Sequence, residues 1–167
     1  MENKKIIAIY PGSFDPITLG HLDILKRSSM LFSKVIVAVA VNSEKKSMFS
    51  QKSRVKMIKD SVNSLKNIEV DNFSGLLVDY AKIKKASVII RGIRALSDYE
   101  YEFNMALMNR SLEKTITTTF LVAHQNYTHL SSSLVREIAK LNGDVSKFVP
   151  KNVIKELNRK VDARNQK

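Results

Sequence analysis

Short apolar runs alternate along the chain with segments in which apolar residues recur every three or four positions. The run Val35–Val41 is apolar throughout and rich in valine, which is typical of a strand buried on both faces in a parallel sheet. Between it and the earlier run Ile6–Tyr10, Leu22, Leu25 and Leu31 fall on or near one face of a helix. The whole pattern predicts strands at 6–10, 35–41, 68–70, 88–90 and 117–122, and helices at 19–31, 50–65, 74–85, 97–112, 131–141 and 150–160.

Strands that alternate with helices imply right-handed crossovers and a parallel sheet. We therefore predict an α/β fold, a doubly wound (Rossmann-like) sheet of five parallel strands with helices on both faces. The 167 residues contain no repeat, low-complexity tract or linker, so they are interpreted as a single domain, 1–167, with a last helix at about 150–160 and a basic tail. Ligands bind beyond the carboxyl ends of the strands in such sheets, so the residues that follow each strand form the candidate site.

The first strand leads into Tyr10–His21, a loop rich in glycine and proline that opens onto a helix. Gly12 lets the backbone approach a ligand, and the free N–H groups at the start of a helix favour an anion. The imidazole of His21 can donate to a phosphate oxygen whether it is neutral or charged. This loop predicts a phosphate site, and a simple tight turn with a surface histidine is the alternative interpretation.

Two later strand ends carry groups of the same kind. Arg91 and Arg94 bracket Gly92 and offer planar forks to phosphate or carboxylate. Ser131–Ser133 precede a helix and offer an N-cap, spare hydroxyls and free N–H groups, which is a further phosphate cradle. The loop Gly12–Gly20 matches neither the G-x-G-x-x-G of dehydrogenases nor the P-loop, which argues against both of those chemistries.

Charge and composition narrow the classes of partner and compartment. Lys and Arg number 28 against 16 Asp and Glu, so the net charge of +12 suits an anionic partner such as polyphosphate, nucleic acid or an acidic surface. The chain has no cysteine, which excludes disulfides and cysteine nucleophiles. No apolar run approaches the length of about 20 residues that spans a bilayer, and no signal-peptide core follows Met1. We expect a soluble, cytoplasmic protein with no membrane partner.

Three motifs resemble those of one enzyme family. Gly12–His21 resembles the signature of the nucleotidyltransferase superfamily, while Arg91–Glu102 and Ser131–Arg136 resemble R-G-[LIV]-R-x-x-x-D-[FY]-E-Y-E and S-S-S-x-[VI]-[RK] of phosphopantetheine adenylyltransferases. The resemblance spans roughly Ile6 to Pro150. It implies an enzyme that transfers AMP from ATP to 4′-phosphopantetheine and gives dephospho-coenzyme A and pyrophosphate. It also implies Mg²⁺ bound mainly through ATP phosphates and a homohexamer.

The resemblance assigns roles residue by residue. His21, Lys45 and Arg91 would be catalytic, and Ser13, Lys45, Leu77 and Arg91 would bind the acceptor, with Leu77 along its pantetheine arm. The residues that would bind ATP are Ser13, Phe14, His21, Gly92, Ile93, Arg94, Glu102, Tyr127, Thr128, His129, Leu130, Ser131, Ser132 and Ser133. His124 and His129 are interpreted as loop residues, and no metal ligand is predicted. The family commonly has threonine, proline, aspartate and tryptophan where this chain has Ser13, Ser47, Gly75 and Tyr127.

Two alternatives stay open. A sibling nucleotidyltransferase that acts on nicotinamide mononucleotide or glycerol phosphate shares the Gly12–His21 motif, but it should lack the Arg91–Glu102 string. A basic nucleic-acid-binding domain is the other, and it predicts aromatic residues interleaved with a basic stripe. Aromatic residues make up only 7% of this chain and are not arranged in that way, so we expect no nucleic-acid partner.

Overall fold

One parallel sheet of five strands organises the fold, in the order β3-β2-β1-β4-β5. The structure is a computed structural model and describes residues 5–41, 47–94 and 96–165. The strands are β1 Ile7–Gly12, β2 Lys34–Ala40, β3 Ile68–Phe73, β4 Val88–Ile93 and β5 Thr117–Val122. All four strand pairings are parallel, and the central register sets Ile9 against both Ile36 and Ile89. The predicted doubly wound sheet is confirmed.

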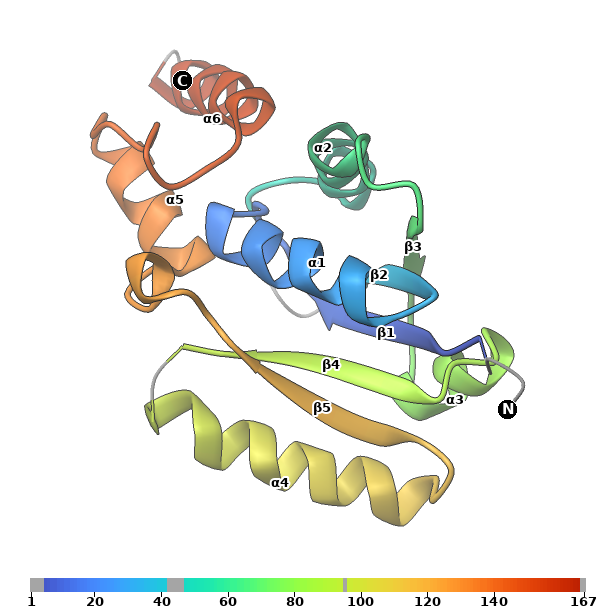
Figure 1. The fold of residues 1–167 in the computed structure, drawn as a ribbon. Helices are drawn as coiled ribbons and strands as arrows, with labels where there is room; N and C mark the ends of the chain where they lie inside the picture. Colours follow the sequence, from blue (N-terminus) through green and yellow to red (C-terminus); the bar gives the residue numbers. More distant parts are fainter. Residues whose placement is uncertain (1–4, 42–46, 95, 166–167) are drawn as a thin grey trace.

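The helices lie on both faces of this sheet (Figure 1). They are α1 Leu19–Leu31, α2 Gln51–Val62, α3 Leu77–Ile83, α4 Leu96–Leu112, α5 Ser132–Lys140 and α6 Lys151–Asn165, with a short 3₁₀ turn, η1, at Gln125–Tyr127. Side chains alternate along each strand, so Ala8 and Tyr10 face the core under α1, α2, α5 and α6, whereas Ile9 faces the smaller core under α3. Helix α4 packs beside α3 on β4 and β5.

Local capping residues explain where three of the helices begin or end. Thr18 caps α1 and Ser50 caps α2, each through a side-chain oxygen that accepts a backbone N–H. Ser131 does the same for α5. At the end of α5, Asn142 takes a left-handed φ of 59° and the N–H of Gly143 donates to the carbonyl of Ile138, which closes the helix.

Several predicted boundaries were wrong by a few residues, and pairing explains the most important one. Strand β4 continues through Arg91 and Gly92 to Ile93, because these residues pair with Phe120–Val122 of β5. Arg91 is therefore held within the sheet and not in the loop after it. Helix α3 is shorter than predicted, since the left-handed Gly75 (φ 83°) precedes it, and α6 is longer. None of the described helices is long and apolar enough to cross a membrane.

Candidate active site

A pocket of about 310 Å³ opens at the carboxyl ends of β1 and β4. The strand order changes direction here, because the chain runs outward from β1 through β2 and β3 and then returns to β4 on the other side. This is the position where open α/β sheets bind ligands. The lining comes from the end of β1 and the residues that follow it (Tyr10–Phe14), the start of α1, the end of β4, Glu102 of α4 and the segment that leads into α5.

His21 stands at the first turn of α1, held by Thr18. The backbone N–H of Thr18 donates to Nδ1 of His21 at 3.0 Å, and Oγ1 of Thr18 accepts the backbone N–H of His21 at 3.4 Å. An Nδ1 that accepts a backbone N–H carries no proton, so the neutral ring has its proton on Nε2. Burial and then the Arg94 charge lower the pKa of His21 to about 4. Near neutral pH the ring is thus an uncharged Nε2–H donor.

Aromatic rings and a glycine shape the wall beside His21. Phe14 meets the imidazole edge to face at a centroid distance of 5.1 Å, and Tyr10 packs against Phe14 at 5.5 Å. A Cβ on Gly12 would lie 3.0 Å from the ring of the buried Phe14, so a larger residue would require that ring to shift. Burial raises the pKa of the Tyr10 hydroxyl, which stays neutral.

Two arginines from β4 and its end enter the pocket with carboxylate partners. Arg91 donates through Nε and Nη2 to the two oxygens of Glu102, and Nη1 donates to the carbonyl of Pro11 at 3.4 Å. Arg94 donates to both oxygens of Asp98 at 2.9 and 3.2 Å and to the carbonyl of Leu130 at 3.1 Å. These two-point contacts fix the planes of both guanidinium groups.

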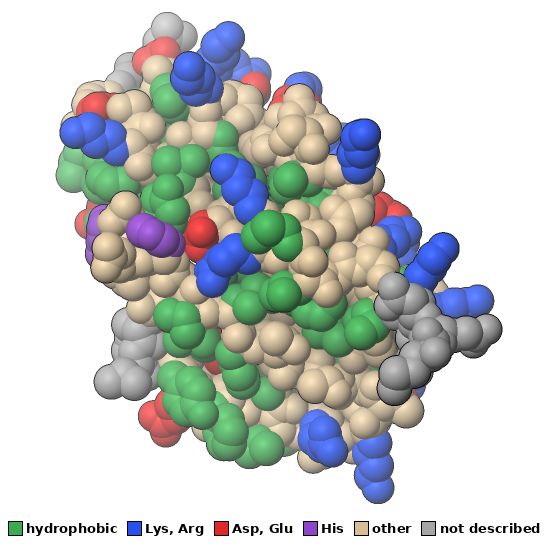
Figure 2. Space-filling view, in the orientation of Figure 1, with side chains coloured by type: hydrophobic (Ala, Val, Ile, Leu, Met, Phe, Trp, Pro, Cys, Tyr) green, Lys and Arg blue, Asp and Glu red, His purple; other side chains and the backbone are tan. Residues whose placement is uncertain are grey.

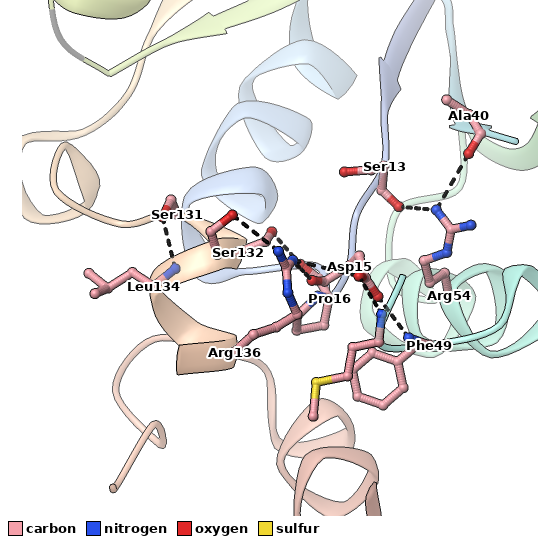
Figure 3. A network of polar contacts seen from close by, with 12 residues as sticks. Ser13, Asp15, Pro16, Ala40, Phe49, Arg54, Ser131, Ser132, Leu134 and Arg136 are labelled. Atoms are coloured by element: carbon pink, nitrogen blue, oxygen red, sulfur yellow. Dashed lines mark hydrogen bonds and ion pairs between the residues drawn. The ribbon is translucent and has the colours of Figure 1, made fainter. Parts of the chain in front are cut away.

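The three serines before α5 line the opposite side. Oγ of Ser131 accepts the N–H of Leu134 at 3.1 Å, and the hydroxyl of Ser132 donates to the carbonyl of Pro16 at 2.7 Å (Figure 3). Ser133 accepts a bond from Arg136 at 3.1 Å. Because the first N–H groups of a helix have no partner within it, this end of α5 is suited to an anion.

Most of the predicted site residues meet in this one pocket. Those that line it are Ser13, Phe14, His21, Arg91, Gly92, Arg94, Glu102, Tyr127, Leu130, Ser131, Ser132 and Ser133. Ile93, Thr128 and His129 do not line it. Leu77 lies in a neighbouring pocket of about 130 Å³, which shares Arg91 and Glu102 with the first and also contains Tyr101, Met105 and Asn109. Lys45 lies outside the described residues.

Sequence reasoning missed polar residues that hold the pocket from behind. Asp15 and Arg54 are 4% and 5% exposed, and Arg54 donates to the carbonyls of Ser13 at 2.6 Å and Ala40 at 3.4 Å. The sequence signal for Arg54 was a charge on the apolar face of a helix, since Arg54 lies one turn before the core residue Ile58. Arg136 ends the Ser131–Arg136 motif, but sequence reasoning gave it no role of its own.

The described residues offer little to a metal ion by themselves. No three His, Asp or Glu side chains within the described ranges lie close enough together to hold one. The carboxylate of Glu102 is already engaged by Arg91, and that of Asp15 by backbone N–H groups. Any Mg²⁺ at this pocket would therefore take most of its oxygen ligands from a bound polyphosphate and from water.

Comparison with known proteins gives consistent results. The Cytidylyltransferase-like family model matches residues 9–138. A phosphopantetheine adenylyltransferase of Alkaliphilus metalliredigens is 54% identical over 92% of this chain and 98% of its own length. The phosphopantetheine adenylyltransferase of Thermosynechococcus vestitus is 53% identical over 91% of this chain and 90% of its own length. That of Clostridium perfringens is 47% identical over 94% of this chain and 96% of its own length.

Solved structures resemble the fold at lower sequence identity. A putative nicotinate-nucleotide adenylyltransferase of Vibrio parahaemolyticus has a TM-score of 0.69 at 19% identity, with 94% of each chain covered. The nicotinic acid mononucleotide adenylyltransferase of Plasmodium falciparum has a TM-score of 0.65 at 19% identity, covering 95% of this chain and 93% of that one. At this identity the likeness concerns the fold alone.

Proposed function

Since the chain belongs to the phosphopantetheine adenylyltransferase family, we propose that it transfers the AMP unit of ATP to the phosphate of 4′-phosphopantetheine. The products are dephospho-coenzyme A and pyrophosphate. The observation that carries this proposal is the pocket where the strand order changes direction. A neutral histidine donor, two oriented arginines and the N-terminus of α5 surround this one space. A sibling enzyme for nicotinamide mononucleotide is disfavoured by the Arg91–Glu102 string.

The reaction needs no covalent intermediate on the protein. A phosphate oxygen of the acceptor forms a bond to the α-phosphorus of ATP, while the bond from that phosphorus to the bridging oxygen of pyrophosphate breaks. The acceptor phosphate is already an anion, so no base has to activate it. The protein contributes alignment of the two reactants and donors for the charge on the transferring group.

His21 would be the donor to the α-phosphate. Its fixed tautomer keeps the Nε2 proton available, and its low pKa keeps the ring uncharged before ATP arrives. A neutral donor that is already oriented stabilises developing charge without reorganisation and does not lose its proton to the phosphate in the ground state. A neutral donor of this kind differs from the two charged arginines of the pocket, which explains why a histidine is useful at this position.

Arg91 and the smaller pocket would receive the acceptor. Glu102 holds the Arg91 fork in one plane at the wall between the two pockets, so the acceptor phosphate can approach Arg91 and Ser13 while the pantetheine arm extends toward Leu77. Lys45, which the family resemblance assigns to the same phosphate, lies outside the described residues. It stays a prediction.

ATP would fill the other side of the larger pocket. Arg94 and the start of α5 would hold its triphosphate, with Mg²⁺ bound mainly by the phosphates and supplying further positive charge. Gly92 leaves space beside Tyr10, since an added Cβ would meet the Tyr10 hydroxyl at 3.3 Å. Tyr127 and Leu130 line the part of the wall that would face the nucleoside.

We also propose that the protein works as a homo-oligomer in the cytoplasm, a hexamer by family resemblance. The support is an apolar surface on α4 that the single chain leaves open. Tyr101, Leu107, Met108 and Leu112 are 65%, 50%, 58% and 54% exposed. Figure 2 shows hydrophobic side chains gathered on the lower part of the molecule, where Figure 1 places α4. A surface of this kind is usual at contacts between copies.

The decisive experiment measures pyrophosphate release from ATP and Mg²⁺ with no acceptor, with 4′-phosphopantetheine and with nicotinamide mononucleotide. Release only with 4′-phosphopantetheine supports the proposal. Release only with nicotinamide mononucleotide would replace the acceptor and retain the ATP site. No release with either acceptor would overturn the proposed reaction, and salt-dependent binding to nucleic acid should then be measured.

A further inference from the structure

A charged residue behind the pocket connects two of its walls. The guanidinium of Arg136, on α5, donates through Nη1 to the backbone carbonyl of Asp15, and the same nitrogen lies 3.6 Å from the Asp15 carboxylate. Arg136 is not among the residues that line the pocket. Its position therefore suits a role carried out through neighbouring groups.

Asp15 is a firm anchor for that guanidinium. It is 4% exposed, and its two carboxylate oxygens accept the N–H groups of Met48 at 2.8 Å and Phe49 at 2.9 Å. A buried carboxylate is tolerated only when it is paired in this way. Asp15 thus ties the β1 loop to the segment before α2, and Arg136 adds α5 to the same junction (Figure 3).

The second nitrogen of Arg136, Nη2, reaches Oγ of Ser133 at 3.1 Å. A guanidinium has donors and no acceptor, so the serine oxygen must accept this bond. The hydroxyl proton of Ser133 is then left free to point elsewhere. Ser132 is in the opposite situation, because its hydroxyl donates to the carbonyl of Pro16 at 2.7 Å and that proton is already used.

We propose that Arg136 is a positioning residue that turns the Ser133 hydroxyl into an oriented proton donor for the triphosphate of ATP. The guanidinium holds the serine oxygen by one nitrogen and is itself anchored on Asp15 by the other. Of the two adjacent hydroxyls, Ser133 donates to phosphate and Ser132 ties α5 to the β1 loop. This inference rests on the proposed function for the identity of the ligand, ATP.

A double-mutant cycle on ATP binding tests the inference without the acceptor. The dissociation constant of ATP and Mg²⁺ is measured by calorimetry for the wild type, Ser133→Ala, Arg136→Gln and the double variant. Loss of one hydrogen bond to a charged phosphate should weaken binding by about 10- to 100-fold in Ser133→Ala. Arg136→Gln should weaken it by a similar factor, and the double variant should bind no more than about threefold more weakly than the worse single variant, because the two residues act as one unit.

Two matched variants sharpen the result. In a Ser132→Ala background, Arg136→Gln should keep its full effect, since Ser132 takes no bond from Arg136. Arg136→Lys retains the charge but replaces the planar fork with one ammonium. It should therefore restore ATP binding only in part, although the family motif admits lysine at this position. Thermal melting shows whether each variant folds. If Arg136→Gln does not fold, Arg136→Lys takes its place in the double-mutant cycle.

Two results would overturn the proposal. If the effects of Ser133→Ala and Arg136→Gln multiply, or if Arg136→Lys binds ATP as the wild type does, Arg136 acts on the phosphates by its charge alone. Failure of the proposed function is seen separately, as a wild type that binds ATP but releases no pyrophosphate with 4′-phosphopantetheine.

Discussion

The backbone N–H of Thr18 donates to Nδ1 of His21 at 3.0 Å. This single bond sets the tautomer of the ring and points the Nε2 proton away from the backbone. Burial and then the nearby Arg94 charge lower the pKa of His21 to about 4, so the ring is a neutral donor near pH 7. Neutral donation is a more specific role than the motif alone indicated, since a histidine at a helix start can donate in either charge state.

The protonation of His21 can be followed directly by NMR. The chain has only 3 histidines, so a His21→Gln variant identifies the His21 ring signal. We expect this signal to titrate with a midpoint near 4 and its ¹⁵N shifts to report an Nε2–H ring at pH 7. A midpoint near the ordinary value of 6.5, or an Nδ1–H ring, would contradict the assignment.

The same pKa shift makes stability depend on pH in a defined direction. The unfolded chain binds the histidine proton near pH 6.5, whereas the folded chain resists it down to about 4. The contribution of His21 to the free energy of unfolding is therefore fully present above pH 6.5 and is lost as the pH falls toward 4. Urea unfolding at several pH values should show this decline in the wild type and a weaker one in His21→Gln.

Removal of the imidazole should affect chemistry far more than folding. His21→Ala takes away one oriented donor to the transferring phosphate, and the expected loss in kcat is on the order of 10²- to 10³-fold. His124→Asn is the matched control, because that histidine lies outside the pocket and asparagine can keep its bond to the N–H of Asn126. Pyrophosphate release gives both rates, and near-normal turnover in His21→Ala would exclude the proposed role.

Thr18 should contribute both to helix stability and to the placement of His21. Thr18→Val keeps the shape but removes Oγ1, which accepts the His21 N–H and contacts Nδ1 at 2.9 Å. Loss of an N-cap of this kind costs about 1 kcal/mol in the free energy of unfolding. Thr18→Ser should restore most of it. Equal stability of the valine and serine variants in urea melts would show that the cap contributes nothing.

Leu77 offers a test of the smaller pocket. Truncation to alanine removes apolar contact for the pantetheine arm, so KM for 4′-phosphopantetheine should rise by about tenfold, while KM for ATP stays unchanged. Leu76→Ala is the comparison, since Leu76 is 57% exposed and does not line that pocket. If both truncations raise KM for the acceptor equally, the arm does not lie in this pocket.

The apolar surface of α4 predicts the state of assembly. Met108→Glu places a charge among exposed apolar side chains, and a buried unpaired charge is costly at an interface between copies. Light scattering after size exclusion should therefore show an oligomer for the wild type and smaller species for the variant. Leu141→Glu, on a leucine that lies just after α5 and is 78% exposed, is the control. A wild type that elutes as a monomer would remove this proposal.

The local elements could be predicted from the chain because each depends on neighbours in sequence. The apolar run at Val35–Val41 and the serines at 131–133 act within a few residues, and the corresponding strand and helix formed at nearly the predicted positions. The Gly12–His21 loop also predicted a phosphate site, because glycine, proline and histidine before a helix start are typical of anion binding.

Tertiary structure was needed wherever the partner of a residue lies far along the chain. β4 extends to Ile93 only because β5 pairs with it, and Arg91 meets the carboxylate of Glu102 only once α4 has packed on that strand. The separate tasks of Ser132 and Ser133 depend on Pro16 and on an arginine anchored at Asp15, more than a hundred positions earlier. The local sequence pattern identifies the chemical groups of the site. Long-range packing decides which of their protons and charges are already engaged by other residues and which can contact a ligand.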